Sequence, residues 1–443
     1  MFTNEEKTLE ALHKKMDHVQ IPEVRLDEAI LRGIHRGKLE APKRKKGVSW
    51  NWRAGLAQAA VVLLLFVLSI RYLDGFAAVV RGIPGMENLV SAIRDEPSLQ
   101  EAIDNHFLQE IGLSDEHDGI KFTVHSVLAD EKRMILFYSI ETDQEFNELT
   151  VRPELIDKDG NKMDQGYAMS VWSVPEPHKS KGKLYQIEFT FTDIEVPEEF
   201  LLEVHISEYR SELPGEWKIP IQLDRSVFAG QKKEFVLNQT FDFEGQKVTV
   251  RDITIYPTRT EIDVMFDEKN SKQVFDIEDL RLVDEKGEFW SGHPGSLSAT
   301  GLQDYMTFYL ESNYFRHPKH LSLQFSKLQA LDKDELDLVI DPAKAEIIKR
   351  PSVGPELSVK REGSLLLITI HDVPDDFHHF VIEKVTDSAG NELNRNSMGV
   401  AETGKDMIFH VPYNDKTVAP GPIRIRMNGF PSYIYGDANI PLY

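Results

Sequence analysis

Cysteine is absent from the 443 residues of the chain. Without thiols the protein can form no disulfide, bind no zinc through thiolates, use no cysteine nucleophile and carry no lipid on a lipoprotein cysteine. The long segment after residue 72 also lacks Gly-x-Ser-x-Gly, a Walker loop, His-Glu-x-x-His and the dinucleotide glycine pattern. We therefore expect no catalytic residue, no cofactor and no metal site in this chain.

Positive charge is scarce. Asp and Glu outnumber Lys and Arg by 73 to 51, which gives a net charge of −22. The deficit lies after residue 53, where 39 basic residues face 65 acidic ones, whereas residues 1–53 hold 12 basic against 8 acidic. An acidic body repels phosphate backbones, so we expect no nucleic acid partner for it. Such a surface suits a hydrated or cation-rich cell wall.

The sequence has one long uncharged run, Ala54–Ile70. Its only polar side chains are Gln58 and Ser69. At about 1.5 Å per residue it spans roughly 26 Å, and extension to 50–72 reaches both interfaces of a bilayer. The sequence therefore predicts one transmembrane helix over 50–72. The residues expected at the membrane interface are Trp50, Trp52, Arg53 and Tyr72.

The charge asymmetry predicts the orientation of this span. Lys and Arg close to a span, such as the run Lys43–Lys46, are retained in the cytoplasm. We expect a cytoplasmic N-terminus and an extracellular C-terminal part at the cell membrane. A cleavable signal peptide and a buried core helix are the alternatives. The signal peptide fits less well because the apolar run begins more than 50 residues into the chain.

The cytoplasmic segment, residues 1–49, carries two apolar stripes with helical spacing that Ile21-Pro22 separates. Fewer than 50 residues cannot build a stable core alone, so the stripes are expected to bind a partner protein. They could also pack on each other in an oligomer, lie on the membrane or form a hairpin without a partner. The expected partner-binding residues are Leu9, Leu12, Met16, Val19, Leu26, Ile30 and Ile34.

The apolar spacing in residues 73–114 predicts short juxtamembrane helices. Two apolar stripes flank Pro84-Gly85, and a third helix is expected to begin at Pro97 and to continue past Phe107 to Ile111, before Gly112. Their apolar content favours packing on the first outer domain over contact with the bilayer.

From Ile120 the pattern alternates as in β-strands, and the chain repeats itself. Arg133 and Arg259 are 126 residues apart and each precedes an apolar strand, while the turns Asp157–Gly160 and Asp284–Gly287 match at an offset of 127. This predicts a mainly β outer part made of tandem immunoglobulin-like β-sandwiches. The expected boundaries are 115–228 and 231–350, with a third, shorter sandwich over 351–443.

Few outer residues suggest a ligand. His317-x-x-His320 and His378-His379 have spacings that suit loops, so solvated histidines are favoured over a metal site. The acidic groups around Asp332–Asp337 and Asp372–Asp376 are interpreted as solvated turns, with calcium sites as the alternative. Trp172, Trp217 and Trp290 are expected in cores, the alternative being carbohydrate platforms.

Several motifs together resemble one family. They are Phe76–Val79, Ile83–Met86 and Leu99–Ile103, followed by an alternating strand and Asp130–Arg133. The chain thereby resembles Gram-positive single-pass membrane proteins whose outer domain has no known function and which are often encoded beside extracytoplasmic-function sigma factors. The resemblance implies an anti-sigma factor or envelope-stress sensor that binds a sigma factor through its N-terminal helices. The absence of cysteine excludes the zinc-type anti-sigma domain.

Two other functions stay open. A structural or adhesive surface protein would have the same outer domains with no cytoplasmic partner, and a cell-wall component could be its ligand. A wall-modifying enzyme would require a buried cluster of convergent polar groups in a cleft of an outer domain.

Overall fold

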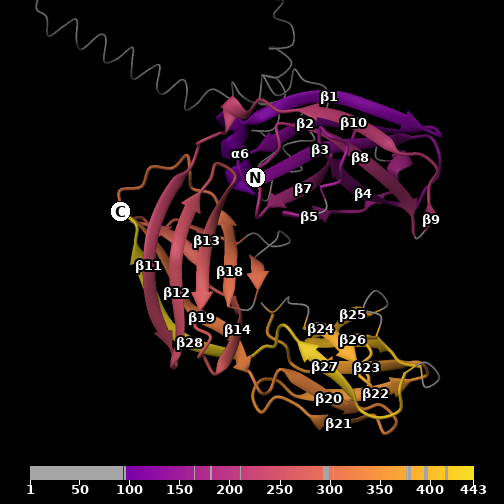
Figure 1. Cartoon of the computed structure of the whole chain (residues 1–443), viewed down its shortest axis with the longest axis vertical. Coiled ribbons are helices and arrows are strands. Elements are labelled where there is room, and N and C mark those ends of the chain that lie inside the picture. Colours follow the sequence, from indigo (N-terminus) through magenta and orange to yellow (C-terminus); the bar gives the residue numbers. More distant parts are fainter. Residues whose placement is uncertain are drawn as a thin grey trace, which may run out of the picture. The chain divides into compact units, whose positions relative to one another are not determined.

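The computed structural model describes residues 93, 96–163, 165–179, 182–209, 211–292, 299–302, 304–375, 377, 381–393, 398–414 and 418–443. All of them belong to one compact unit, Phe76–Tyr443 (Figure 1). No helix in these ranges is long and apolar enough to cross a bilayer. The predicted cytoplasmic segment, the predicted span and the juxtamembrane residues up to 92 lie outside them.

The described residues form six antiparallel sheets and one α-helix, α6 (Pro97–Asp104). The sheets occur in pairs, and each pair encloses one hydrophobic core. We call these pairs the first, second and third β-units. Along most strands buried and exposed side chains alternate, because successive residues of a strand point to opposite faces of the sheet.

The first β-unit follows α6. One sheet has the order β1-β2-β3-β7-β5 and the other β10-β8-β4-β6, with β9 paired to β8. The strands are β1 (Leu108–His117), β2 (Ile120–Ala129), β3 (Arg133–Thr142), β4 (Glu148–Ile156), β5 (Tyr167–Val171), β6 (Val174–Pro175), β7 (Tyr185–Phe191), β8 (Glu199–Glu208), β9 (Ser211–Glu212) and β10 (Trp217–Gln222). Trp217 is fully buried, and its indole N–H donates to the carbonyl of Ile120 at 2.9 Å, which links the two sheets.

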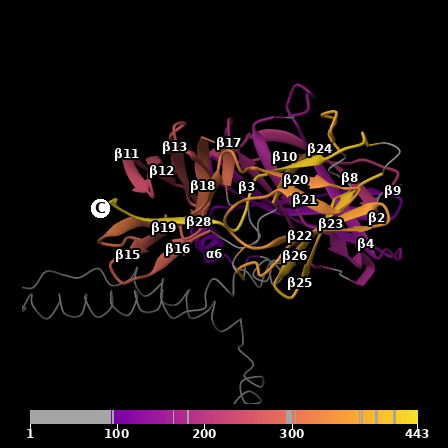
Figure 2. The same cartoon turned by 90° about the horizontal axis from the view of Figure 1, so that it is seen from below.

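The second β-unit repeats the first sheet order as β11-β12-β13-β18-β17. Its other sheet contains β14, β19, β15 and β16, and β19 also pairs with the C-terminal strand β28 (Figure 2). The strands are β11 (Lys233–Phe243), β12 (Gln246–Ile255), β13 (Arg259–Phe266), β14 (Lys272–Ile277), β15 (Arg281–Asp284), β16 (Phe289–Ser291), β17 (Ala299–Leu302), β18 (Tyr305–Glu311), β19 (Leu321–Asp332) and β28 (Tyr433–Pro441).

The third β-unit is inserted between β19 and β28. Its sheets have the orders β21-β20-β27-β24 and β22-β23-β26-β25. The strands are β20 (Asp337–Asp341), β21 (Glu346–Lys349), β22 (Leu357–Glu362), β23 (Leu365–Ile370), β24 (Ile382–Thr386), β25 (Gly399–Thr403), β26 (Asp406–Pro412) and β27 (Ile423–Met427).

Two element assignments differ from the sequence prediction. The third predicted helix ends at Asp104 and does not reach Ile111, because His106 adopts a positive φ of 68° and the chain then enters β1, which pairs with β2. The first β-unit therefore begins before residue 115. The predicted second sandwich, 231–350, includes the strand Asp337–Asp341, but this strand pairs with β27, and Leu338 and Ile340 are buried in the third core. The strand that completes the second β-unit is β28.

The first and second β-units meet through a buried polar junction. Arg133 donates to the carbonyl of Thr258 at 3.1 Å, and Arg259 donates to the carbonyl of Lys132 at 3.1 Å. Donors and acceptors are each 126 residues apart, so the two contacts are reciprocal, as in a two-fold symmetric interface. Asp130, which has no exposed surface, adds hydrogen bonds from the Thr258 N–H at 3.1 Å and hydroxyl at 2.5 Å.

The Arg133 side chain also forms ion pairs with two carboxylates on its own side of the junction. It contacts Glu188 at 2.9 Å and Glu96 at 2.5 Å, and it is 4% exposed. Burial alone would lower the pKa of this guanidinium, but the two carboxylates outweigh burial and raise it. Arg133 is therefore a permanent buried cation with two anionic partners.

Candidate functional site

The sequence-predicted site residues cannot be placed. Leu9, Leu12, Met16, Val19, Leu26, Ile30, Ile34, Trp50, Trp52, Arg53 and Tyr72 all lie outside the described residues. His378 and His379 lie outside them too. Trp217 and Trp290 are buried in cores as expected, whereas Trp172 is 64% exposed.

Several of the acidic side chains noted in the sequence have partners in the structure. Asp337 binds Arg424 at 2.8 Å and Arg426 at 3.4 Å, and Asp332 binds Lys272 at 2.9 Å. The carboxylate of Asp157 accepts the N–H groups of Asp159 at 2.9 Å and Asn161 at 2.8 Å, which fixes a turn. These carboxylate oxygens fix local backbone turns or neutralise nearby arginine and lysine side chains.

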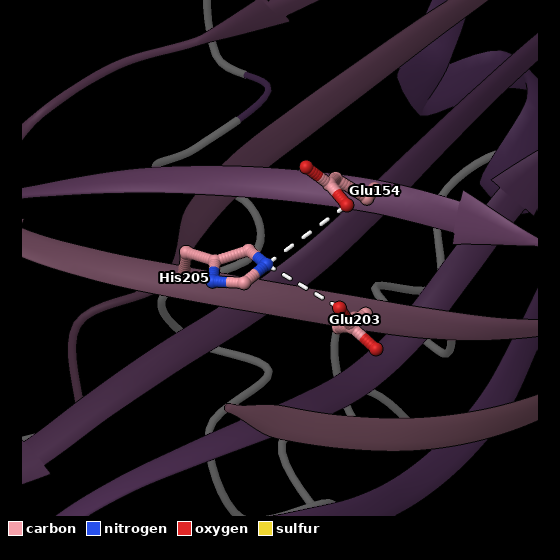
Figure 3. Close-up of side chains that lie close together, drawn as sticks. All are labelled: Glu154, Glu203 and His205. Atoms are coloured by element: carbon pink, nitrogen blue, oxygen red, sulfur yellow. Dashed lines mark ion pairs between the residues drawn. The ribbon is translucent and has the colours of Figure 1, made fainter. Parts of the chain in front are cut away.

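A different cluster does bring metal-ligating side chains together. Glu154, Glu203 and His205 each offer one ligand atom, and the three atoms lie within 4.8 Å of one another. The cluster lies on the first β-unit: Glu154 comes from β4, and Glu203 and His205 from the adjacent β8 (Figure 3). Glu154 is the cross-strand partner of Glu203. Glu203 and His205 are two residues apart, so the pleat places both on the same face.

The histidine ring is flanked by carboxylates on both sides. Its Nε2 lies 3.3 Å from Glu203 and 3.9 Å from Glu154, and its Nδ1 lies 3.0 Å from Glu212 of β9. Nε2 is shielded from solvent and has no hydrogen-bond partner of good geometry. A neutral imidazole carries one N–H and one lone pair, so in either tautomer a lone pair faces a carboxylate. The arrangement favours a cation at the nitrogen that lacks the hydrogen.

Two lysines partly neutralise these carboxylates. Lys162 contacts the Oε2 atom of Glu154, and Lys218 lies 3.3 Å from the Oε2 atom of Glu203. The hydrogen bond from Lys162 lowers the pKa of Glu154 and outweighs the opposing effect of burial. Hydrogen bonds to Glu216 and Glu203 raise the pKa of Lys218. The Glu154 carboxylate and the Lys218 ammonium therefore stay charged at neutral pH.

An open groove of about 660 Å³ lies beside the cluster. Its lining residues are Asp115, His117, His205, Glu212, Leu213, Gly215, Glu216 and Lys218. Burial would raise the pKa of Asp115, but the N–H groups of Lys218 and Glu116, together with His117, lower it. His117 packs edge-on against Trp217 at 5.4 Å. The groove therefore reaches the His205 ring beside Glu212.

This cluster was not among the predicted sites, because His205 has no second histidine and no run of acidic residues beside it in the sequence. The available signal was Glu203-x-His205 in an alternating strand, since a spacing of two places both side chains on one face. Glu154 lies 49 residues before Glu203, so its pairing with Glu203 depends on the register of β4 and β8. That register could not be derived from the residues alone.

Comparisons with known proteins identify two family models. One, described as "Domain of unknown function (DUF4179)", matches residues 48–142, and the other, "Family of unknown function (DUF5643)", matches residues 232–359. The chain is thus similar to two families of unknown function. No curated protein matches.

Two solved structures are similar to parts of the chain. The "conserved domain protein from Bacillus anthracis" is 16% identical with a TM-score of 0.39, and the match covers 55% of this chain and 85% of that one. The "Biofilm associated protein - BSP domain" is 8% identical with a TM-score of 0.11, over 80% of this chain and 69% of that one. Neither likeness carries an argument about function.

Proposed function

We propose that the chain is a single-pass membrane regulator that senses the cell envelope outside and holds a sigma factor inside through its N-terminal helices. The observation that carries the proposal is the match of residues 48–142 to a family of unknown function. This range includes both the predicted span and the strands up to the end of β3. The family unit therefore combines a strongly apolar segment with the start of the first β-unit.

The described β-units suit the outer half of such a regulator. Each has two antiparallel sheets around one core, and this arrangement supports the proposal that the units are immunoglobulin-like sandwiches. They need no disulfide, which agrees with the absence of cysteine. The proposed role is binding and signalling, with no enzymatic step, and the proposed setting is the cell membrane with the acidic body facing the cell wall.

Capture of a sigma factor by the full-length chain in detergent tests the inner half of the proposal. Leu12→Asp and Ile30→Asp each place a charge on a predicted apolar stripe, and we expect each to weaken capture at least about tenfold. Lys14→Gln is the control because a spacing of two residues would place position 14 on the opposite face of the predicted helix from Leu12. If the native chain retains no sigma factor, a structural or adhesive surface role replaces the regulatory one.

Protease added to intact cells tests the orientation. We expect the β-units to be cleaved and residues 1–49 to be protected. Protection of folded, membrane-attached β-units would reverse the orientation and remove the regulatory proposal.

A further inference from the structure

The strongest unexplained feature of the described residues is the environment of His205. Its two ring nitrogens face three carboxylates, those of Glu154, Glu203 and Glu212. The histidine side chain is 14% exposed, and so is that of Glu203. A lone pair directed at a carboxylate in a partly desolvated site is repulsive unless a positive charge lies between them.

We propose that Glu154, Glu203 and His205 bind one divalent transition-metal ion of the zinc class, with water from the groove as a further ligand. Two ligands about 2.0–2.1 Å from a tetrahedral zinc ion lie about 3.3 Å apart. The separations from His205 Nε2 are 3.3 Å to Glu203 and 3.9 Å to Glu154. Small side-chain movements therefore suffice to close the site.

Glu212 occupies the position of an orienting group for the ligand. Metal-binding histidines usually donate their second ring N–H to a carboxylate, which fixes the tautomer and the ring direction. The Nδ1 atom lies 3.0 Å from Glu212, and this contact leaves Nε2 as the nitrogen available to the metal. Arg152 contacts the same Oε1 atom of Glu212 at 3.2 Å.

The donor set selects the class of metal. One imidazole nitrogen and two carboxylate oxygens suit zinc and neighbouring first-row ions, whereas calcium and magnesium prefer sites made of oxygen alone. Lys218 contacts Oε2 of Glu203 while Oε1 faces the histidine, so that lysine can stay in place when the metal binds. Lys162 contacts the same Glu154 oxygen that faces His205, so it competes with the metal. Its side chain is 51% exposed and can swing away.

The site is independent of the proposed regulatory function. The test uses the full-length chain in detergent, stripped of metal by a chelator and titrated with Zn²⁺ by calorimetry. We expect one bound ion per chain. His205→Ala and Glu203→Gln should each weaken binding by at least about 100-fold, and Glu212→Gln by about 10- to 100-fold.

Two further variants separate the site from adventitious binding and from misfolding. Lys162→Ala removes the competing ammonium and should tighten binding about five- to tenfold, a gain that a misfolded chain cannot give. His371→Ala, whose histidine binds Asp406 in the third β-unit, is the matched control and should bind as the native chain does. The visible absorption of bound Co²⁺ should report a low-coordinate site that His205→Ala loses.

Three outcomes would overturn the proposal. They are no stoichiometric Zn²⁺ binding by the native chain, unchanged binding by His205→Ala, and unchanged or weaker binding by folded Lys162→Ala. In the first case the contacts with Lys162, Lys218 and Arg152, and not a metal ion, balance the carboxylates.

Discussion

Arg133→Met tests whether the junction between the first and second β-units depends on a buried charge. The substitution keeps much of the side-chain volume but removes every donor of the guanidinium. It leaves Glu96 and Glu188, whose side chains are 12% and 15% exposed, without their cation. It also removes the donor to the Thr258 carbonyl.

The expected effect is large. Removal of one partner from a buried ion pair typically destabilises a protein by about 3–5 kcal/mol, because the other charge stays buried without compensation. Arg133 has two anionic partners, so we place the loss at about 3–5 kcal/mol or slightly above. This is a large part of the roughly 5–15 kcal/mol by which a domain is stable.

Hydrogen exchange measured by mass spectrometry on the full-length chain is the suitable assay, because a chain with several β-units does not unfold in one step. Amides of α6, β3 and β7 should exchange about 100- to 4000-fold faster in the variant, since about 1.4 kcal/mol corresponds to tenfold. The segment around Thr258 should lose protection with them, while β26 in the third β-unit should not change.

Two comparisons make this reasoning refutable. Arg152→Met breaks an exposed pair with Glu212, whose partners are 59% and 56% exposed, and should change stability by no more than about 1 kcal/mol. Adding Glu188→Gln to Arg133→Met should recover part of the loss, because it removes one uncompensated charge. If Arg133→Met loses no more stability than Arg152→Met, the buried charges make no net contribution to stability and the reasoning is refuted.

Three more predictions follow from the second β-unit. Truncation after Ser432 removes β28 with the buried Ile434 and Ile440, so it should destabilise this unit by about 3–6 kcal/mol, seen as faster exchange in β19 but not in β23. Gly436→Ala would place a Cβ 2.6 Å from the Phe243 ring, so thermal unfolding should show that this unit loses about 1–3 kcal/mol of stability. The control Gly399→Ala, whose Cβ would have its nearest contact at 3.8 Å, should lose less than about 1 kcal/mol. Burial would raise the pKa of Asp279, but hydrogen bonds from Ser326 and Lys327 lower it, so its stabilising effect is present above pH ~3.8 and lost as the pH falls through the folded pKa. Asp279→Asn should therefore be less stable than the native chain in denaturant melts at pH 6, with a difference that narrows below pH ~3.8; a constant difference would contradict this.

Local structure was the most predictable part of the fold. Strands beginning at Arg133 and Arg259 are present as β3 and β13. The turns at Asp157, Asp284 and Asp387 share one arrangement, in which the aspartate accepts the N–H groups two and four residues on. Alternation and turn chemistry act over a few residues, so they can be read from the sequence.

Long-range pairing was not predictable in the same way. The predicted second sandwich took in Asp337–Asp341 (β20), whereas the structure completes this unit with Tyr433–Pro441 (β28). The choice depends on the cores. Leu338 and Ile340 are buried in the third core, whereas Ile434 and Ile440 are buried in the second. The ion pairs of Asp337 with Arg424 and Arg426 further attach β20 to β27 of the third β-unit. The Glu154, Glu203 and His205 cluster escaped prediction for the same reason, because it depends on which strands are neighbours.

The reciprocal junction also explains why the third β-unit is attached differently. A two-fold symmetric contact closes on itself, since each repeat uses the same surface to bind the other. Arg133 already binds the Thr258 carbonyl of the second β-unit, and Arg259 already binds the Lys132 carbonyl of the first. A third repeat could not be added by the same contact. The chain instead places the third β-unit between β19 and β28, so that two covalent connections hold it and the returning strand completes the second β-unit.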